Sequence, residues 1–553
     1  MCGIVGYAGN IETACGKPLE VCLQGLERLE YRGYDSAGVA LTAPGMDKVV
    51  VRKKAGRLKN LVEDIERKPM PLATVGIGHT RWATNGEPSD VNAHPHTSMD
   101  GKVAIIHNGI IENASQLRLD LQAEGYRFAS ATDTEVAAKL LGKIVDKIIA
   151  DEGKPDLFKA VRRMARMLEG AFTILATDCR QPDIVVGARH DSPLVVGLGE
   201  GENFLGSDVA AFVAYTKRAM EVDQDQAVCV SADKVIVADF NGNVVENPKT
   251  YTVDWDASAA EKGGWDSFMD KEIHEDPAAV QRTLLGRFDT NGDITLDEVR
   301  IDEHDFKSID KIIVVACGTA SYAGQVAKYA IEHWVRIPVE IELAHEFRYR
   351  DPILTPRTLV VAISQSGETM DTLMALRHAR EQGSKVLAIC NTQGASIPRE
   401  SDAVLYTHAG PEVAVASTKA FVAQITAAYL LGLYLAQVKG AMFRDEIHQM
   451  LDSLKDMPRK IQWVLDTQPK TIQAAAERMV NANSFLFLGR HVGYPVALEG
   501  ALKLKEIAYT FTEGFAAGEL KHGPIALVDE GEPVVFIVPP QRGRNVLHAK
   551  VIS

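Results

Sequence analysis

The chain has 553 residues, of which 46% are hydrophobic and 24% charged, and its formal net charge is −14. This length holds roughly two to four domains, and the acidic balance without a basic tract argues against a nucleic-acid or acidic-membrane partner. The sequence begins with no basic, apolar leader and contains no unbroken apolar run of about 18 residues. Its 7 cysteines are scattered and form no CxxC pair. We therefore expect a cytoplasmic protein with reduced thiols that binds neither membrane nor nucleic acid.

The first part of the chain, residues 2–250, predicts many short strands and two longer helices. The helices cover 12–29 and 134–147, the second capped by Thr132 or Asp133. Alternating or apolar runs predict strands at 48–52, 103–106, 172–176, 184–188 and 234–238. This mixture favours an α+β sandwich over a parallel sheet.

The next segment, 251–302, is polar and acidic, and we expect it to be a linker. Asp289-Thr-Asn-Gly-Asp293 resembles a calcium loop at first sight. However, Ile294 occupies the position where the sharp turn requires glycine, and Arg300 the position where a bidentate glutamate is required. A solvated turn is the better interpretation.

After residue 302 the pattern becomes α/β. Helices predicted from Ser321 and Met370 alternate with apolar strands at 311–316, 358–363, 385–390 and 403–406. Such runs are typical of a parallel sheet covered on both faces. The pattern recurs as a strand at 485–489, a helix at 494–509 and a strand at 534–538. We expect two doubly wound domains, 303–443 and 475–553, the second truncated, because half a unit would leave an unpaired sheet edge.

Cys2 is the most informative residue. Removal of the initiator methionine would give this cysteine a free α-amine, which titrates near pH ~8 and is therefore partly a neutral base. A base and a thiol on one residue form a self-contained acyl-transfer group. Three motifs accompany it, RGYD at 32–35, HTRWAT at 79–84 and HNG at 107–109.

An amide hydrolase of this kind must hold a charged amino acid and stabilise an oxyanion. Arg81 can bind an α-carboxylate with two hydrogen bonds, and Asp133 can pair with an α-ammonium. The Asn108 side chain and the Gly109 amide can form an oxyanion hole, worth roughly 3–4 kcal/mol per donor. The histidines at 79, 94 and 96 lack the spacing and the carboxylate companion of a zinc site, so we expect no metal.

A phosphate site is predicted at Ser364-Gln-Ser-Gly-Glu-Thr369, which follows a strand and opens a helix. Hydroxyls and helix N–H groups converge on such a turn at the ligand-binding edge of an open α/β sheet. The Gly318-Thr319 turn and the loop that carries Val415 and Ser417 add donors at the same edge.

The chain contains, in this order, CGIVGY, LEYRGYDSAG, HTRWAT, HNGIIEN, SQSGET, STKAF, ALEGALKLKEI and GELKHGP. With these motifs it resembles the glutamine–fructose-6-phosphate aminotransferase (isomerising) family over essentially its whole length. The resemblance implies an N-terminal class II (Ntn) glutamine amidotransferase domain with an αββα sandwich, followed by two parallel, doubly wound sugar-isomerase (SIS) domains. It also implies conversion of L-glutamine and D-fructose 6-phosphate to L-glutamate and D-glucosamine 6-phosphate, the entry to amino-sugar synthesis, without a cofactor.

The resemblance assigns roles at the glutamine site. Cys2 would form a glutamyl thioester, Trp82 would gate an ammonia channel, and Arg32 would support the closed site. Asn85 stands where the family often has histidine, so the resemblance does not predict the details of glutamine affinity. The glutamine pocket would be lined by Arg81, Thr84, His94, Gly109 and Asp133.

The resemblance also assigns roles at the sugar site. Glu506 would move a proton between sugar C1 and C2 with support from Lys503, and His522 would open the ring. In the family His522 comes from the neighbouring subunit, so a homodimer is implied. The family's Schiff-base lysine lies in its extreme C-terminal tail, and no residue here receives that role. Sugar phosphate would bind Thr319, Ser364, Gln365, Ser366, Thr369, Val415 and Ser417.

Three alternatives remain open at this stage. One is a fragment that retains glutaminase activity but lacks synthase activity. Another is a different class II amidotransferase, acting on a phosphoribosyl or aspartyl acceptor, although the 364–369 loop and the repeated α/β unit argue against it. The third is a regulator that senses sugar phosphates, which would usually carry a helix-turn-helix and would tolerate loss of Glu506.

Overall fold

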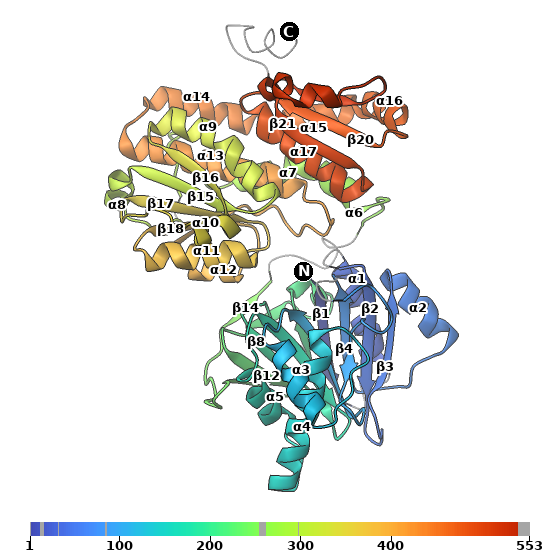
Figure 1. The fold of residues 1–553 in the computed structure, drawn as a ribbon. Coiled ribbons are helices and arrows are strands. Elements are labelled where there is room, and N and C mark those ends of the chain that lie inside the picture. Colours follow the sequence, from blue (N-terminus) through green and yellow to red (C-terminus); the bar gives the residue numbers. More distant parts are fainter. Residues whose placement is uncertain are drawn as a thin grey trace. The chain divides into compact units, whose positions relative to one another are not determined.

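The computed structural model describes residues 2–10, 16–30, 33–82, 86–253, 262–296 and 298–539. The chain divides into two compact units, Met1–Glu261 and Lys262–Ser553, and Figure 1 shows that strands run through both. The two units have different architectures.

The N-terminal unit contains two antiparallel sheets. The first has the strand order β14 (Thr250–Thr252), β11 (Arg218–Glu221), β9 (Val195–Leu198), β10 (Glu202–Gly206), β1 (Gly3–Gly9), β4 (Val75–Arg81), β2 (Ser36–Thr42), β3 (Val50–Ala55). The second has the order β13 (Val235–Asp239), β12 (Gln226–Val230), β8 (Gln181–His190), β7 (Phe172–Asp178), β6 (Val103–Gly109), β5 (His96–Thr97). Five helices accompany them: α1 (Lys17–Arg28), α2 (Leu58–Arg67), α3 (Ala114–Ala123), α4 (Asp133–Glu152) and α5 (Leu157–Ala165).

Three apolar cores define the layers of this unit. Ile4, Ile77 and Ile106 belong to the core between the two sheets. A second core joins α1 and α2 to the outer face of the first sheet, and a third joins α4 and α5 to the outer face of the second. The layers are therefore helix, sheet, sheet, helix, as predicted. Thr132 caps α4, because its hydroxyl accepts the N–H of Glu135 at 3.3 Å.

The main sheet of the C-terminal unit is entirely parallel. Its order is β16 (Val339–Leu343), β15 (Lys311–Ala316), β17 (Thr358–Ser364), β18 (Lys385–Cys390), β19 (Ala403–Tyr406). In chain order this is 2-1-3-4-5, a doubly wound arrangement whose switch point lies between β15 and β17. Ligands of such sheets bind at the carboxyl ends of the strands beside the switch point.

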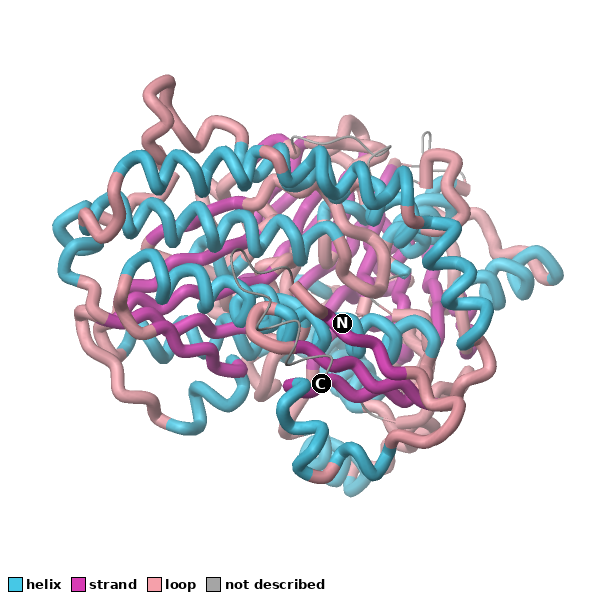
Figure 2. Tube along the Cα trace, turned by 90° about the horizontal axis from the view of Figure 1, so that it is seen from above, coloured by secondary structure: helices cyan, strands magenta, loops and turns pink. Residues whose placement is uncertain are grey.

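Successive residues of these strands enter two different cores. Ile312, Val314 and Leu359 face the core formed with α7 (Asp276–Leu284), α8 (Glu303–Ser308), α9 (Thr319–Val335), α13 (Lys419–Lys439) and α14 (Arg444–Lys455). Ile313 and Val315 face the core formed with α10 (Ala344–Arg350), α11 (Met370–Glu381) and α12 (Ser396–Glu400). Helices thus cover both faces of this sheet; Figure 2 draws the helices of the chain in cyan and its strands in magenta.

A second parallel sheet repeats the start of the first. Its order is β21 (Phe511–Ala516), β20 (Ser484–Gly489), β22 (Val534–Ile537), with α17 (Gly493–Ala508) after β20. β20 therefore corresponds to β15 and β22 to β17. The remaining helical elements are α6 (Phe268–His274), α15 (Met457–Thr467), α16 (Pro469–Met479) and the short 3-10 turns η2 (Val209–Ala211), η4 (Ala517–His522) and η5 (Pro524–Leu527).

One segment differs in detail from what the sequence pattern indicates. Within the predicted linker 251–302, the structure forms α6 and α7, and Val280 and Leu284 of α7 enter the main core. α13 is the one described helix that is long and apolar enough to cross a membrane. Its apolar side chains pack between α9 and the sheet, so its composition follows from burial.

Candidate active sites

Cys2 lies immediately before β1, beside the end of β4. The backbone N–H of Trp82 donates to the Cys2 sulfur at 3.1 Å, and the thiol lies 3.5 Å from the Trp82 carbonyl oxygen. Burial raises the pKa of this thiol, while the Trp82 amide and the charge of Arg81 act in the opposite direction. A base is therefore needed to produce the thiolate, which is the role that the sequence assigns to the cysteine's own amine.

Asn108 and Gly109 end β6 next to Cys2. The Asn108 Nδ2 donates to the Cys2 carbonyl at 2.7 Å, so the amide predicted for the oxyanion hole touches the nucleophilic residue. Gly109 has φ +117°, and a Cβ at this position would lie 2.0 Å from the Ala171 carbonyl oxygen. Only glycine fits this turn.

His79 on β4 holds Asn108 in place. Its Nε2 lies 3.1 Å from Asn108 Oδ1 and 2.9 Å from the His107 carbonyl oxygen. Both partners are acceptors, so this nitrogen carries the proton. Burial lowers the pKa of His79 to about 3, which keeps the ring neutral. Sequence reasoning did not assign this role, although the residue opens the HTRWAT motif.

His94 and His96 continue a row of buried rings from His79. The ring centroids of His79 and His94 are 4.3 Å apart, and those of His94 and His96 are 5.2 Å apart. Burial lowers the pKa of both well below the ordinary value. Among the described residues of this unit, no three metal-ligating side chains converge on one point, so the row is a neutral support beneath Asn108.

Arg81 is buried and Asp133 is partly buried near the nucleophile. Burial lowers the pKa of Arg81, and the charges of Cys2, Asp35 and Asp133 act against this effect. Asp133 begins α4, and its Oδ2 accepts the N–H of Ile111 at 3.0 Å. The carboxylate therefore fixes the segment after Gly109 as well as adding negative charge. Arg32, Thr84 and Asn85 lie outside the described residues.

Trp82, the predicted gate, has its amide on the Cys2 sulfur while its side chain is 43% exposed. The indole meets Tyr34 edge to face, with ring centroids 5.5 Å apart. A large ring so close to the nucleophile has room to move without disturbing a packed core.

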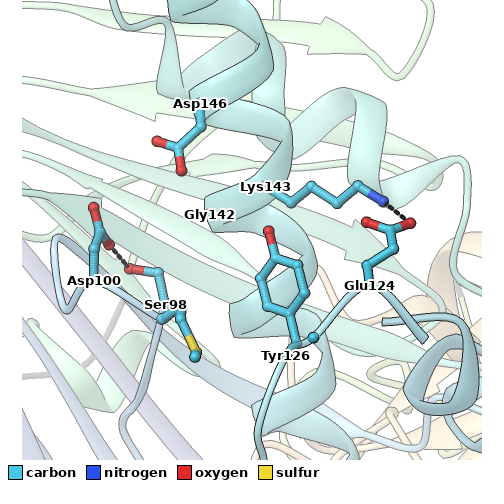
Figure 3. A pocket seen from close by; sticks show the side chains of 9 residues that line it. Ser98, Asp100, Glu124, Tyr126, Gly142, Lys143 and Asp146 are labelled. Carbon is cyan, nitrogen blue, oxygen red and sulfur yellow. Dashed lines mark hydrogen bonds and ion pairs between the residues drawn. The ribbon is translucent and has the colours of Figure 1, made fainter. Parts of the chain in front are cut away.

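A cavity of about 370 Å³ lies elsewhere in this unit (Figure 3). Ser98, whose hydroxyl donates to Asp100 at 2.6 Å, and Lys143, paired with Glu124, line it. Ser98 adjoins the Val103 end of β6, whereas Asn108 lies five residues further along that strand, roughly 17 Å away. This cavity is therefore separate from the nucleophile site.

The predicted phosphate loop connects β17 to α11 at the switch point. The Ser364 hydroxyl accepts the Gly367 N–H at 3.0 Å and lies 3.1 Å from the Thr369 hydroxyl. The Ser366 hydroxyl accepts the N–H of Glu368 at 3.2 Å. Gly367 has φ +67°, and a Cβ there would lie 2.7 Å from the Cys390 sulfur. The turn is thus tightly closed, and its hydroxyl and amide groups lie close together.

Gln365 and the 415–417 segment occupy neighbouring loops. The Gln365 carbonyl accepts the Asn391 N–H at 3.2 Å, which anchors the turn to the end of β18. The Ser417 hydroxyl donates to Glu412 at 2.8 Å, and Val415 is 48% exposed. This loop opens α13, so its donors lie at a helix start beyond β19.

Thr319, Lys503 and Glu506 form a connected polar cluster. Lys503 Nζ donates to the Thr319 hydroxyl at 3.0 Å and lies 2.8 Å from a Glu506 oxygen. Because Thr319 follows β15 and the phosphate loop follows β17, and these strands are paired, the cluster stands beside the switch point.

Glu499 belongs to the same cluster and was missed by sequence reasoning. It accepts from Thr319 at 3.1 Å and lies 3.3 Å from Lys503; burial raises its pKa. The spacing of 499, 503 and 506 on one helix face was the available signal. His522, in contrast, is exposed and forms no hydrogen bond or ion pair with another described residue.

Comparison with known proteins gives the same division of the chain. A model of the glutamine amidotransferase domain matches residues 79–214, and a model of the SIS domain matches 305–434 and 478–550. A solved C-terminal domain of glucosamine-fructose-6-phosphate aminotransferase from Francisella tularensis is 40% identical, with a TM-score of 0.51, over 53% of this chain and 81% of that one.

Curated relatives match this chain over its whole length. Glutamine--fructose-6-phosphate aminotransferase [isomerizing] of Corynebacterium efficiens is 63% identical over 554 residues, covering 100% of this chain and 88% of the relative. The protein of the same name from Streptomyces coelicolor is 59% identical with the same coverage. The resemblance predicted from the motifs is confirmed: this chain belongs to the glutamine–fructose-6-phosphate aminotransferase (isomerising) family.

Proposed function

We propose that the chain transfers the amide nitrogen of L-glutamine to D-fructose 6-phosphate and yields L-glutamate and D-glucosamine 6-phosphate. The observation that carries the proposal is the Thr319–Lys503–Glu506 cluster beside the Ser364–Thr369 loop. It places a carboxylate suited to proton transfer next to a loop suited to a phosphate, in a chain that also has an amide-hydrolysing site.

At the first site, Cys2 attacks the glutamine amide carbon after its proton passes to the residue's own amine. The amide N–H groups of Asn108 and Gly109 stabilise the oxyanion, and collapse of the tetrahedral intermediate expels ammonia and leaves a thioester that water hydrolyses. Arg81 and Asp133 hold the α-carboxylate and the α-ammonium. Thr84 and His94 complete the pocket, and Arg32 supports its closed form.

At the second site, the 364–369 loop, Thr319 and the 415–417 segment bind the phosphate and the sugar. His522 opens the ring, and it comes from a neighbouring subunit in a homodimer. Its exposure, without a hydrogen bond or ion pair to another described residue, supports this proposal. Ammonia adds to the C2 carbonyl of the open sugar and water leaves, which gives an imine. Glu506 then moves a proton from C1 to C2, with Lys503 holding the carboxylate and neutralising its charge.

Ammonia passes between the sites without entering bulk water, where it would be protonated and diluted. Trp82 gates this passage, supported by its contact with the Cys2 sulfur and its half-exposed ring. The reaction is cytoplasmic and uses no cofactor: the amide supplies the nitrogen, and lysine and glutamate supply the acid–base chemistry.

Glutamine labelled with ¹⁵N at the amide tests the proposal directly. We expect fructose 6-phosphate to stimulate glutamate release and the label to appear in glucosamine 6-phosphate. Stimulation by a phosphoribosyl or aspartyl acceptor instead would identify another class II amidotransferase. Glutamate release without labelled sugar would indicate glutaminase activity alone, and no release under any condition would favour a sugar-phosphate sensor.

A further inference from the structure

Three metal-ligating side chains from different elements converge in the C-terminal unit, outside the sites described above. Cys317 directly follows β15, His345 is in the first turn of α10, and Asp371 is in the first turn of α11. The Cys317 sulfur, an imidazole nitrogen of His345 and a carboxylate oxygen of Asp371 all lie within 4.8 Å of one another. Among the described residues, no other group of three such donors lies this close together.

The separations suit a tetrahedral ion. The sulfur lies 3.9 Å from His345 Nδ1, whereas two such ligands on tetrahedral zinc lie about 3.6 Å apart. Side-chain rotation alone can close this difference. Asp371 is exposed, and the His345 side chain is 44% exposed, so an ion can enter from solvent.

The surroundings support each ligand. The Thr372 hydroxyl lies 3.9 Å from the Cys317 sulfur, where it would stabilise a metal-bound thiolate. On the other side of the imidazole, His345 Nε2 lies 3.8 Å from a Glu346 oxygen, which is longer than a hydrogen bond. Rotation of the exposed Glu346 side chain would bring its carboxylate to the position of an outer partner in zinc sites.

We propose that Cys317, His345 and Asp371 form a binding site for a divalent transition-metal ion of the zinc class. A thiolate, an imidazole and a carboxylate together favour zinc or cobalt over magnesium or calcium, which prefer oxygen ligands. Three protein ligands leave the fourth position open to water. The ion would link the segment between β15 and Thr319 to helix α11, which follows Thr369. These two elements lie on opposite sides of the switch point.

Cobalt titration of the reduced, chelator-treated full chain tests the site, because thiolate-bound cobalt absorbs where aqueous cobalt does not. Cys2→Ala serves as the parent, so that the nucleophile cannot bind the probe. We expect one equivalent of cobalt with a thiolate charge-transfer band, abolished by addition of one equivalent of zinc. Cys317→Ser should remove the band.

His345→Gln and Asp371→Asn should each weaken cobalt binding at least tenfold, and Glu346→Gln about tenfold, as loss of an outer partner does. His333→Gln, an exposed histidine of the same unit, is the matched control and should change nothing. Because 345 and 371 are accessible positions, these variants report on the site even if the cysteine variant fails to fold.

Absence of a thiolate band in the parent at millimolar cobalt would overturn the proposal. So would a band that persists in Cys317→Ser, or binding that the His345 and Asp371 variants leave unchanged. None of these readouts depends on the amidotransferase reaction, so the metal site and the proposed function stand or fall separately.

Discussion

The proposed nucleophile site of the N-terminal unit is supported by neutral rings, whereas the proposed sugar-phosphate site of the C-terminal unit is lined by charges. Beneath Asn108, burial lowers the pKa of His79, His94 and His96. Beside Thr319, a lysine lies between two glutamates. A neutral support fixes an amide donor without competing for the oxyanion. A charged cluster, in contrast, keeps a carboxylate ready to exchange protons with a substrate.

The same contrast extends to groups away from the reacting atoms. In the C-terminal unit, burial and the charge of Glu412 raise the pKa values of Glu272 and Asp276 to about 7, and Lys419 opposes this. The N-terminal unit thus buries bases that stay unprotonated, and the C-terminal unit buries acids that hold their protons. Opposite responses of the two units to pH should follow.

The largest separable effect is expected at Glu506. Proton transfer between C1 and C2 without ammonia would convert fructose 6-phosphate to glucose 6-phosphate, so this conversion measures the C-terminal site alone. Glu506→Gln keeps the shape but removes the base, so the conversion should fall about 10²–10⁴-fold. Glutamine hydrolysis without sugar should keep its rate. Lys505→Gln, on the exposed side of the same helix, is the control. An isomerase rate unchanged in Glu506→Gln would remove the carboxylate from the mechanism.

Asn108 gives the corresponding effect in the other unit. Asn108→Ala should lower kcat for glutamine hydrolysis about 10²–10³-fold, because it removes one oxyanion donor, and should leave sugar isomerisation intact. Alkylation of Cys2 should continue, which shows that the nucleophile is still present. Asn241→Ala, at an exposed turn, is the matched control. A loss of alkylation together with activity would point to misfolding instead.

The pH response of the two units should differ in sign. Unfolded histidines take up protons below pH ~6.5, but the buried histidines of the N-terminal unit do not until far lower pH. Its free energy of unfolding should therefore decrease on acidification from pH 7, by up to about 1.4 kcal/mol per such histidine and pH unit. In the C-terminal unit, the raised carboxyl pKa values contribute stability at low pH that is lost as pH rises to about 7.

Hydrogen exchange read by mass spectrometry measures both units in one sample, because peptides report on each separately. After correction for the intrinsic exchange rate, protection in α4 and β6 should fall from pH 7 to pH 5.5. Protection in α7 and α13 should fall from pH 5.5 to pH 8. A parallel response of the two units would contradict the account of their buried groups.

Asp276 provides the smallest expected effect. One of its carboxylate oxygens is buried without a hydrogen-bond partner, so ionisation above pH 7 is costly. Asp276→Asn should raise the unfolding free energy by about 1 kcal/mol at pH 8, a figure reduced for partial exposure. At pH 5 the gain should be less than about half of this, because the loss of stability that begins near the unfolded pKa is then only partly complete. Thermal melts at both pH values, with exposed Asp266→Asn as control, measure it. Stabilisation of equal size at both pH values would exclude ionisation as the cause.

The fold was predictable where one pattern dominates. Apolar runs gave β15, β18 and β19 at their observed bounds, because strands buried on both faces leave a continuous signal. The edge strand β16 alternates Val, Glu, Ile, Glu and was not predicted. The cap of α4 by Thr132 was predictable because capping depends on local geometry. Helices α6 and α7 were not, because their polar surfaces conceal the few residues that reach the core.

The sequence motifs name candidate reacting residues but not the residues that support them. Cys2, Asn108 and Lys503 lie in long motifs, and the structure places Asn108 on the Cys2 carbonyl and Lys503 beside Glu506, while the roles of these residues stay predictions. His79 and Glu499 act through another residue across the fold, and this relation has no signature in the chain order. The convergence of Cys317, His345 and Asp371 likewise depends on the switch-point topology, because no short spacing joins them.

The central claim is that Cys2 begins the reaction in one unit while the other unit handles the sugar independently. Cys2→Ala, assayed in parallel for glutamate release and for conversion of fructose 6-phosphate to glucose 6-phosphate, tests it most directly. The account predicts that glutamate release falls at least about 10³-fold, as removal of a nucleophile does, while sugar isomerisation is retained. Undiminished glutamate release from this variant would show that another group cleaves the amide and would contradict the account.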